Sequence, residues 1–141
     1  MRITRLLFYF AVGILLGGSC TYALGQDYAV ATLTSYHFDR TKDYNERNFG
    51  AGWERQKDDW SIGTGFYRNS IDKTTLYALG GWTPFRVLGT RVGLAAGPAT
   101  GYDCGHKICT IGGGLVQGEY FNLAVTPVAV ALQLKWRFSA P

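Results

Sequence analysis

The sequence predicts an all-β protein, an eight-stranded antiparallel transmembrane β-barrel of the outer membrane that follows a cleaved signal peptide. Three observations lead to this prediction. Apolar residues alternate with small or polar ones along most of the chain, and a period of two is typical of strands. Glycine and aromatic residues are frequent, whereas no helical apolar period is found. The chain also ends in Trp136-Arg137-Phe138, and the last strand of outer-membrane barrels ends in phenylalanine in the same way.

The first 25 residues have the pattern of a secretory signal peptide. Two arginines precede an apolar run over residues 6–18, and small and polar residues follow it. This run of about 13 residues is too short to span a bilayer but fits the hydrophobic region of a signal peptide, roughly 7–15 residues. Cleavage is expected after Ala23 or Gly25. A lipoprotein signal that ends at Cys20 is the alternative.

Charge and cysteine content exclude some classes of function. The formal charge of +4 falls to +2 once the two signal-peptide arginines are removed. The chain has no basic stripe, so nucleic-acid binding is not expected. Cys104 and Cys109 remain in the exported part, and an even pair in such a chain predicts a disulfide. The alternative is a metal site with His106, but three ligands within six residues rarely complete a tetrahedral centre, so neither a metal nor a cofactor is expected.

Eight strands are expected in residues 26–141, which form a single barrel domain. Each strand is a run of alternating, β-branched or aromatic residues, and each ends where charged residues, glycine or proline indicate a turn. Pro84 predicts a turn over residues 83–89, and Pro127 predicts the break between the last two strands. In chain order, the strands are expected at residues 28–38, 49–56, 60–68, 74–82, 90–102, 108–117, 120–126 and 128–138.

The two faces of these strands favour a membrane barrel. In the last strand, Leu132 and Trp136 lie on one face, whereas Gln133 and Lys135 lie on the other. The small and polar face would make a poor soluble core. An apolar, aromatic-rimmed outer face suits lipid, and strands of roughly 9–11 residues are long enough to cross a bilayer. A soluble sandwich or lipocalin-like barrel, with its apolar face inward, is the alternative.

Strand parity predicts which residues meet at one end of the barrel. If the N-terminus lies in the periplasm, the connections 39–48, 69–73 and 103–107 open outside, and His37, Ser70 and the cysteine pair converge on the outer rim. A histidine can act as a general base near neutral pH, and a serine hydroxyl can be a nucleophile or a positioning donor. A solvated histidine and an ordinary Asn-Ser turn are the structural alternative.

Part of the chain, from about residue 36 to 100, resembles the outer-membrane lipid A palmitoyltransferases. A histidine is followed, after a polar spacer, by the motif YNER and a glycine-rich strand. The segment FYRNS is similar to the family's F-x-Asp-Ser segment, and LYALGGW is similar to its following Gly-x-Gly-Trp strand. The motif residues are His37, Tyr44, Asn45, Glu46, Arg47, Asn69, Ser70 and Gly81.

The resemblance implies an enzyme that moves a palmitoyl-type chain from a phospholipid to a hydroxyl of lipid A. It implies a location in the outer membrane of a Gram-negative bacterium, and we expect a monomer without a cofactor. His37, Asn69 and Ser70 would be catalytic, with Asn69 in place of the family's aspartate, and Gly81 would floor the acyl-chain pocket. Asn48 stands where a family proline is expected. The alternatives are a non-enzymatic barrel with surface-binding loops and an outer-membrane phospholipase or lipid A deacylase.

Overall fold

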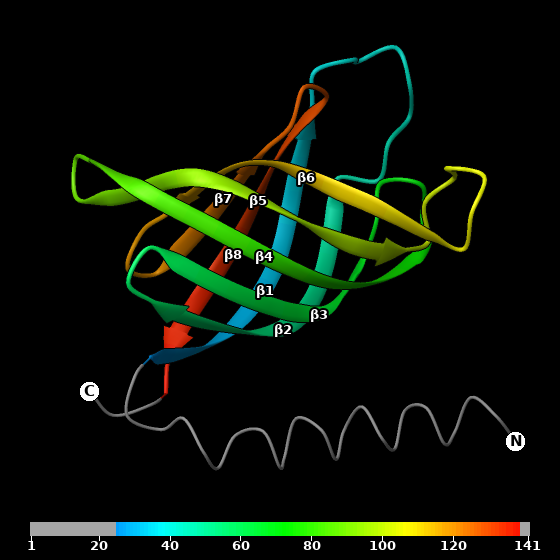
Figure 1. Ribbon diagram of the computed structural model, residues 1–141. Helices are drawn as coiled ribbons and strands as arrows, with labels where there is room; N and C mark the ends of the chain where they lie inside the picture. Colours follow the sequence, from blue (N-terminus) through cyan, green and yellow to red (C-terminus); the bar gives the residue numbers. More distant parts are fainter. Residues whose placement is uncertain (1–24, 139–141) are drawn as a thin grey trace, which may run out of the picture.

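The structure is a computed structural model that describes residues 25–138, and these form one closed β-barrel (Figure 1). Residues 1–24 of the predicted signal peptide lie outside the described part. Consecutive strands pair antiparallel, and β1 pairs with β8 to close the barrel. The strands are β1 (Gln26–His37), β2 (Arg47–Lys57), β3 (Trp60–Arg68), β4 (Thr74–Val87), β5 (Thr90–Thr100), β6 (Ile108–Gln117), β7 (Phe121–Val125) and β8 (Ala129–Arg137). No helix within residues 25–138 is long and apolar enough to cross a membrane.

The barrel has two ends of different character. Tight turns connect the strands at one end, which we call the turn end. Three longer connections and one of three residues gather at the other, the loop end, where the connection after β1 rises at the top of Figure 1 and the one after β5 lies at its right. The loop-end connections are residues 38–46, 69–73, 101–107 and 126–128, and the turn-end connections are residues 58–59, 88–89 and 118–120.

The predicted number and order of strands are confirmed, but the predicted turn over residues 83–89 is wrong. Strand β4 continues to Val87, and only two residues connect it to β5. Pairing between the two strands is interrupted between Trp82 and Phe85 and then resumes. Pro84 lies in this interruption, and because proline has no N–H it is tolerated in strands at such bulges. The proline therefore marks a bulge in the strand instead of its end.

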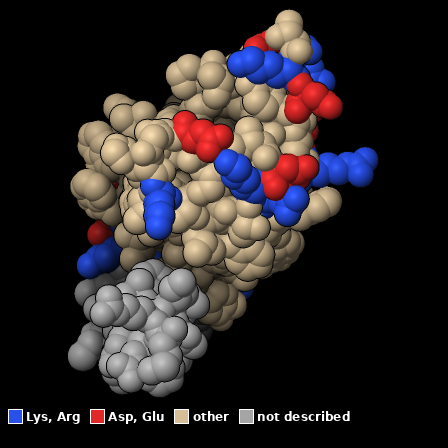
Figure 2. Space-filling view, turned by 90° about the vertical axis from the view of Figure 1, so that its right-hand side faces the viewer, with Lys and Arg blue, Asp and Glu red and all other residues tan. Residues whose placement is uncertain are grey.

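Small and polar side chains point into the barrel, and large apolar side chains cover its outside, as the alternation predicted. Lys135 is fully buried, and Gln133 of β8 donates a hydrogen bond inside the barrel to its paired residue Thr32 of β1 at 3.1 Å. The face in Figure 2 shows charged side chains of both signs with broad uncharged areas between them. Exposed large apolar residues include Tyr36, Phe38, Phe49, Trp60, Ile62, Phe66, Leu76, Trp82, Phe85, Leu94, Ile108, Tyr120, Trp136 and Phe138.

A buried polar cluster fills the interior near the turn end. Glu54 lies at its centre: its Oε1 accepts hydrogen bonds from Gln56 at 2.6 Å, Gln117 at 3.3 Å and Lys135 at 3.4 Å. Its Oε2 accepts from Asn122 at 2.7 Å. One carboxylate thus meets the charge of the lysine and the hydrogen-bonding needs of three amides. Because buried charges are tolerated only when paired and hydrogen-bonded, this cluster depends on Glu54.

We expect Glu54→Leu to destabilise the barrel, because it leaves the ammonium group of Lys135 buried without a counter-charge. Breaking a buried ion pair from one side costs about 3–5 kcal/mol, whereas replacing both partners by apolar residues is often neutral. The double variant Glu54→Leu/Lys135→Met should therefore recover part of the loss, whereas the amides of Gln56, Gln117 and Asn122 still lack their acceptor in it. Thermal unfolding in detergent micelles, followed by circular dichroism, measures both. Equal stability of the single and double variants would contradict this account.

Candidate functional site

A cavity of about 450 Å³ runs inside the barrel from the loop end to the polar cluster. Its walls are mostly glycine, alanine and aliphatic or aromatic side chains. Because these leave the upper interior unfilled, the barrel can hold an elongated apolar ligand. At the loop end the cavity is lined by Ser35, His37, Asn48, Ser70 and Tyr102, in the middle by Tyr77, Leu79, Ala95, Gly113 and Ala131, and at the bottom by Glu54, Ser61, Gly81, Leu115 and Asn122.

A bulge in β1 turns His37 into this cavity. Tyr28, Val30 and Thr32 are buried in the first part of the strand. The pairing with both neighbouring strands then shifts by one residue between Thr32 and Thr34. Beyond the shift the odd-numbered residues face inward, so that His37 lines the cavity and is only 6% exposed. Bulges re-aim side chains in this way because they change the alternation of faces.

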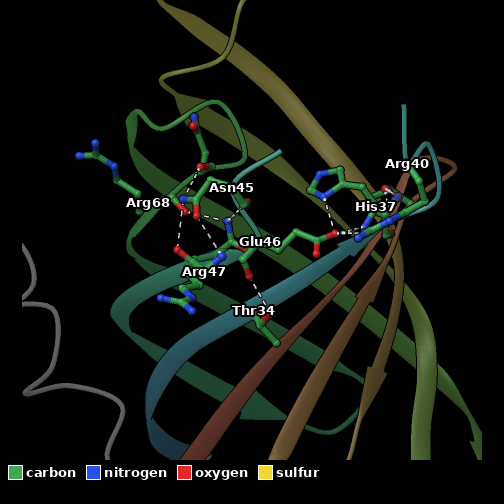
Figure 3. Close-up of polar contacts among 11 residues, drawn as sticks. Thr34, His37, Arg40, Asn45, Glu46, Arg47 and Arg68 are labelled. Atoms are coloured by element: carbon green, nitrogen blue, oxygen red, sulfur yellow. Dashed lines mark hydrogen bonds and ion pairs between the residues drawn. The ribbon is translucent and has the colours of Figure 1, made fainter. Parts of the chain in front are cut away.

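The imidazole of His37 lies between the ring of Tyr44 and the carboxylate of Glu46, and Figure 3 shows the carboxylate side. Its ring stacks on Tyr44, with 4.3 Å between the ring centroids. Its Nδ1 lies 3.9 Å from Oε1 of Glu46 and is buried without a hydrogen-bond partner among the described residues. The backbone N–H of His37 donates to the same carboxylate oxygen at 3.1 Å. A proton on the imidazole would therefore meet a negative charge next to it.

Several contacts hold the Glu46 carboxylate in place and keep it charged. The guanidinium of Arg40 donates to its Oε1, and the backbone carbonyl of Glu46 accepts from the hydroxyl of Thr34 at 2.6 Å (Figure 3). The backbone N–H of His37 lowers the pKa of Glu46 most, and the hydrogen bond and charge of Arg40 lower it further. A carboxyl group whose pKa is lowered from its ordinary value is ionised at neutral pH.

The YNER segment also ties the connection after β1 to the connection after β3. The backbone N–H of Asn45 donates to the carbonyl of Ser70 at 2.9 Å, and its side-chain amide donates to the carbonyl of Asn69 at 3.2 Å. Asn48 donates to the carbonyl of Arg68 at 2.9 Å. These bonds hold Ser70 on the rim of the same cavity as the histidine. Arg47, the last residue of the motif, is exposed.

Asn69 has a different environment from the one that a catalytic partner of the histidine would need. It is fully buried, and its Nδ2 donates to Oγ1 of Thr75 at 3.1 Å and to the carbonyl of Gly101 at 2.8 Å. Its Oδ1 accepts from the backbone N–H groups of Ile71 at 3.1 Å and Lys73 at 2.9 Å. An asparagine side chain has two donors and two acceptor sites, so Asn69 is fully engaged in holding the turn.

Of the remaining predicted residues, Gly81 lies away from the rim, whereas the cysteine pair lies at the loop end, as strand parity predicted. Gly81 lies in the lower cavity wall, where a Cβ atom would clash with Oγ of Ser61 and approach Leu115 to 3.1 Å. The predicted disulfide is confirmed, with 1.95 Å between the sulfur atoms; it joins Cys104, in the connection after β5, to Cys109 at the start of β6. Among residues 25–138, no group of three or more His, Cys, Asp or Glu side chains is placed to hold a metal ion.

Two polar residues at the rim were missed by the sequence analysis. Oγ of Ser35 and Oδ1 of Asn48 line the cavity with His37 and are buried without a hydrogen-bond partner in the described part of the chain. The amide orientation of Asn48 is fixed, because its Nδ2 donates to the carbonyls of Asn45 and Arg68. Ser35 could have been found from its spacing of two residues from the histidine, which places both on one face.

The wall beside the cavity has an interrupted hydrogen-bond ladder. Strands β6 and β7 pair over only four residues of each, 114–117 with 122–125. Residues 108–113 of β6 line or flank the cavity, but β7 is too short to pair with them. The barrel is therefore closed by continuous pairing near the turn end and only loosely joined here near the loop end.

Comparison with known proteins adds no family to this description. No protein-family model matches the chain, and no curated protein matches it either. The palmitoyltransferase resemblance therefore stays a sequence-based expectation, and the roles of the rim residues have to be argued from their geometry.

We expect Asn69→Asp to lower the thermal stability of the barrel, although the family resemblance would place an aspartate at this position. A carboxylate oxygen would replace the Nδ2 group that donates to the carbonyl of Gly101, so two acceptors would face each other at 2.8 Å. Loss of this buried hydrogen bond should cost about 1–3 kcal/mol. Thermal unfolding in micelles measures the loss, with the exposed Asp72→Asn as control. An Asn69→Asp barrel as stable as the wild type would contradict the assignment of Asn69 to the turn.

Proposed function

We propose that this protein is an outer-membrane acyltransferase that moves a palmitoyl-type chain from a phospholipid to a hydroxyl of lipid A. One observation carries the proposal: His37 and Ser70 line the mouth of an elongated cavity whose walls are mostly small or apolar. Transfer between an ester and an alcohol needs a base for the alcohol proton and donors for the developing oxyanion. It also needs a dry space for the hydrocarbon chain, which this cavity offers.

The outer surface of the barrel supports a position in a membrane. Exposed aromatic residues gather near both ends of the strands, with aliphatic residues such as Ile62 and Leu94 between them. Two such aromatic belts around an apolar band are typical of outer-membrane barrels. The aromatic residues near the loop end are Tyr36, Phe38, Phe49 and Phe66, and those near the turn end are Trp60, Trp82, Phe85, Tyr120, Trp136 and Phe138. The loop end would then face outward.

The rim residues suggest how the transfer proceeds. His37 takes the proton of the lipid A hydroxyl, and the oxygen attacks the acyl carbonyl of the phospholipid. The ester bond to glycerol then breaks, a new ester to lipid A forms, and the imidazolium returns the proton to the departing glycerol oxygen. Glu46, next to Nδ1, stabilises the imidazolium. Oδ1 of Asn48 is free to accept a hydrogen bond from a second hydroxyl of the lipid A acceptor and so position it, and the hydroxyl of Ser70 serves as a donor to the oxyanion.

The interrupted ladder between β6 and β7 supports supply of the chain from the side. A phospholipid in the surrounding leaflet has to pass its acyl chain through the wall, and a continuous ladder would prevent this. Pro127 follows β7, and Pro98 on β5 lies opposite Thr110 of β6. Both prolines lack the N–H that a strand ladder uses. This part of the wall is therefore the easiest to open.

A hydrolase is the second candidate, because of a specific observation. The free polar atoms of Ser35, His37 and Asn48 could hold a water molecule as well as an alcohol. With water as the attacking group, the product would be a free fatty acid instead of a new lipid A ester. The two activities therefore differ in their product and not in the residues used.

We expect His37→Ala to abolish acyl transfer. Cells that produce the wild-type chain should show lipid A with one added palmitoyl mass, which is absent with the variant, because no other described group takes the proton. Mass spectrometry of extracted lipid A is the measurement. The matched control is His106→Ala, which removes the second histidine of the chain, in the exposed disulfide loop. Lipid A unchanged by the wild-type chain would refute the transferase, and release of free fatty acid that requires His37 would support the hydrolase.

We expect Glu46→Gln to lower the transfer rate, by about 10²-fold, the order that one positioned acid or base contributes. The amide keeps the size of the side chain and can still accept a bond from the His37 N–H, but it has no charge to stabilise the imidazolium. The control is Asp43→Asn, an exposed carboxylate in the same connection. Initial rates with the purified barrel in mixed micelles give the comparison. A Glu46→Gln rate equal to the control would show that this charge is not used.

A further inference from the structure

The cavity does not end as a hydrocarbon pocket should. A plain acyl chain needs apolar contacts along its whole length, since burying a polar group without a partner is unfavourable. The lower walls near Leu115 and Gly81 meet this need, but the bottom is polar. Glu54, Ser61 and Asn122 line it, directly above the buried polar cluster. The end of a bound chain would therefore lie against oxygen atoms.

One of these oxygens has an unused hydrogen-bonding site. Asn122 is only 2% exposed, and its Oδ1 is buried without a hydrogen-bond partner in the described residues. The orientation of its amide is fixed by its neighbours. Its Nδ2 donates to Oε2 of Glu54 at 2.7 Å and to Oε1 of Gln133 at 3.4 Å. A carboxylate oxygen only accepts, so Oδ1 cannot occupy the place of Nδ2, and the free atom is an acceptor.

The surrounding side chains do not supply the missing donor. Nε2 of Gln133 donates to Oγ1 of Thr32 at 3.1 Å. The amides of Gln56 and Gln117 donate to Oε1 of Glu54. These amides are thus engaged within the cluster, and among the described residues neither the ammonium of Lys135 nor the hydroxyl of Ser61 donates to Oδ1 of Asn122. The donor that Oδ1 of Asn122 lacks has to come from whatever occupies the cavity.

We propose that the chain bound in this cavity carries a hydroxyl group at its deep end and donates it to Oδ1 of Asn122. The ligand class is a fatty acyl chain hydroxylated at or near its terminal carbon. That the chain is an acyl group rests on the proposed function, whereas the hydrogen bond to Asn122 does not. Gly81 adds room beside Ser61 where a larger residue would not fit. A chain that ends in a methyl group leaves the acceptor of Asn122 unsatisfied and binds less well.

Competitive binding tests this directly, without any need for turnover. The probes are hexadecanoic acid and its derivatives hydroxylated at the terminal or the neighbouring carbon, offered in pairs to the folded barrel in detergent micelles. Native mass spectrometry gives the ratio of the two complexes. We expect one hydroxylated isomer to be retained about fivefold or more over the plain chain, because it satisfies a buried acceptor. Equal retention of all chains would mean that water serves Asn122, and would overturn the proposal.

Variants of one strand locate the effect. Asn122→Leu should lower the preference, because the acceptor Oδ1 is removed and an apolar side chain takes its place beside Glu54 and Ser61. Glu54 keeps its bonds from Gln56, Gln117 and Lys135 in this variant. If Asn122→Leu fails to fold, as judged by heat-modifiable gel mobility, Asn122→Ala replaces it. Leu123→Ala, at the next position of β7, is the control and should keep the wild-type ratio. If the folded variant at position 122 keeps the full preference for the hydroxylated chain, the role of Asn122 is refuted.

Failure of this proposal differs from failure of the proposed function. A hydroxyl preference in binding, with lipid A unchanged in cells, would retain the ligand class and refute the acyltransferase. Palmitoyl transfer to lipid A, together with equal binding of plain and hydroxylated chains, would retain the acyltransferase and refute the hydroxylated ligand. The two measurements thus give separate answers.

Discussion

The candidate site depends on one local constraint, the bulge in β1. Before it, Tyr28, Val30 and Thr32 face inward, and after it Ser35 and His37 do. Without this shift the alternation of faces would have continued, and the histidine would point away from the cavity. Because β1 pairs with both β2 and β8 to close the barrel, the shift has to fit the pairing with both strands. Each of these strands keeps its own inward face toward the interior.

The interior between the eight strands is divided into two parts, one filled by side chains and one open. Near the turn end, long polar side chains fill it and are held together by a single carboxylate, that of Glu54. Toward the loop end, residues such as Gly113 and Ala131 leave the interior open. The polar cluster gives the barrel a packed base, so the upper wall can be left with an interrupted ladder between β6 and β7. The cavity and the opening beside it therefore rely on the cluster below them.

The sequence was sufficient for the strands, their order, their faces and the disulfide, because period two and turn residues act locally. It was insufficient where one residue changes the pattern. Pro84 was interpreted as a turn, although a bulge accommodates it within β4. Strict alternation could not place His37 inside, since the position of a bulge depends on both neighbouring strands. The free acceptors of Asn48 and Asn122 also depend on partners 20 or more residues away, which no local pattern contains.

The geometry also changes which residue should supply charge to the histidine. The family resemblance implied a catalytic role for Asn69, which stands in place of the family's aspartate. Asn69 instead saturates its hydrogen bonds within the turn and against Gly101, where an amide is required. The carboxylate next to the imidazole is Glu46, from the same segment in which Asn45 holds Ser70 at the rim. One short segment thus combines the charge and the positioning, so the asparagine is compatible with an acyl-transfer site.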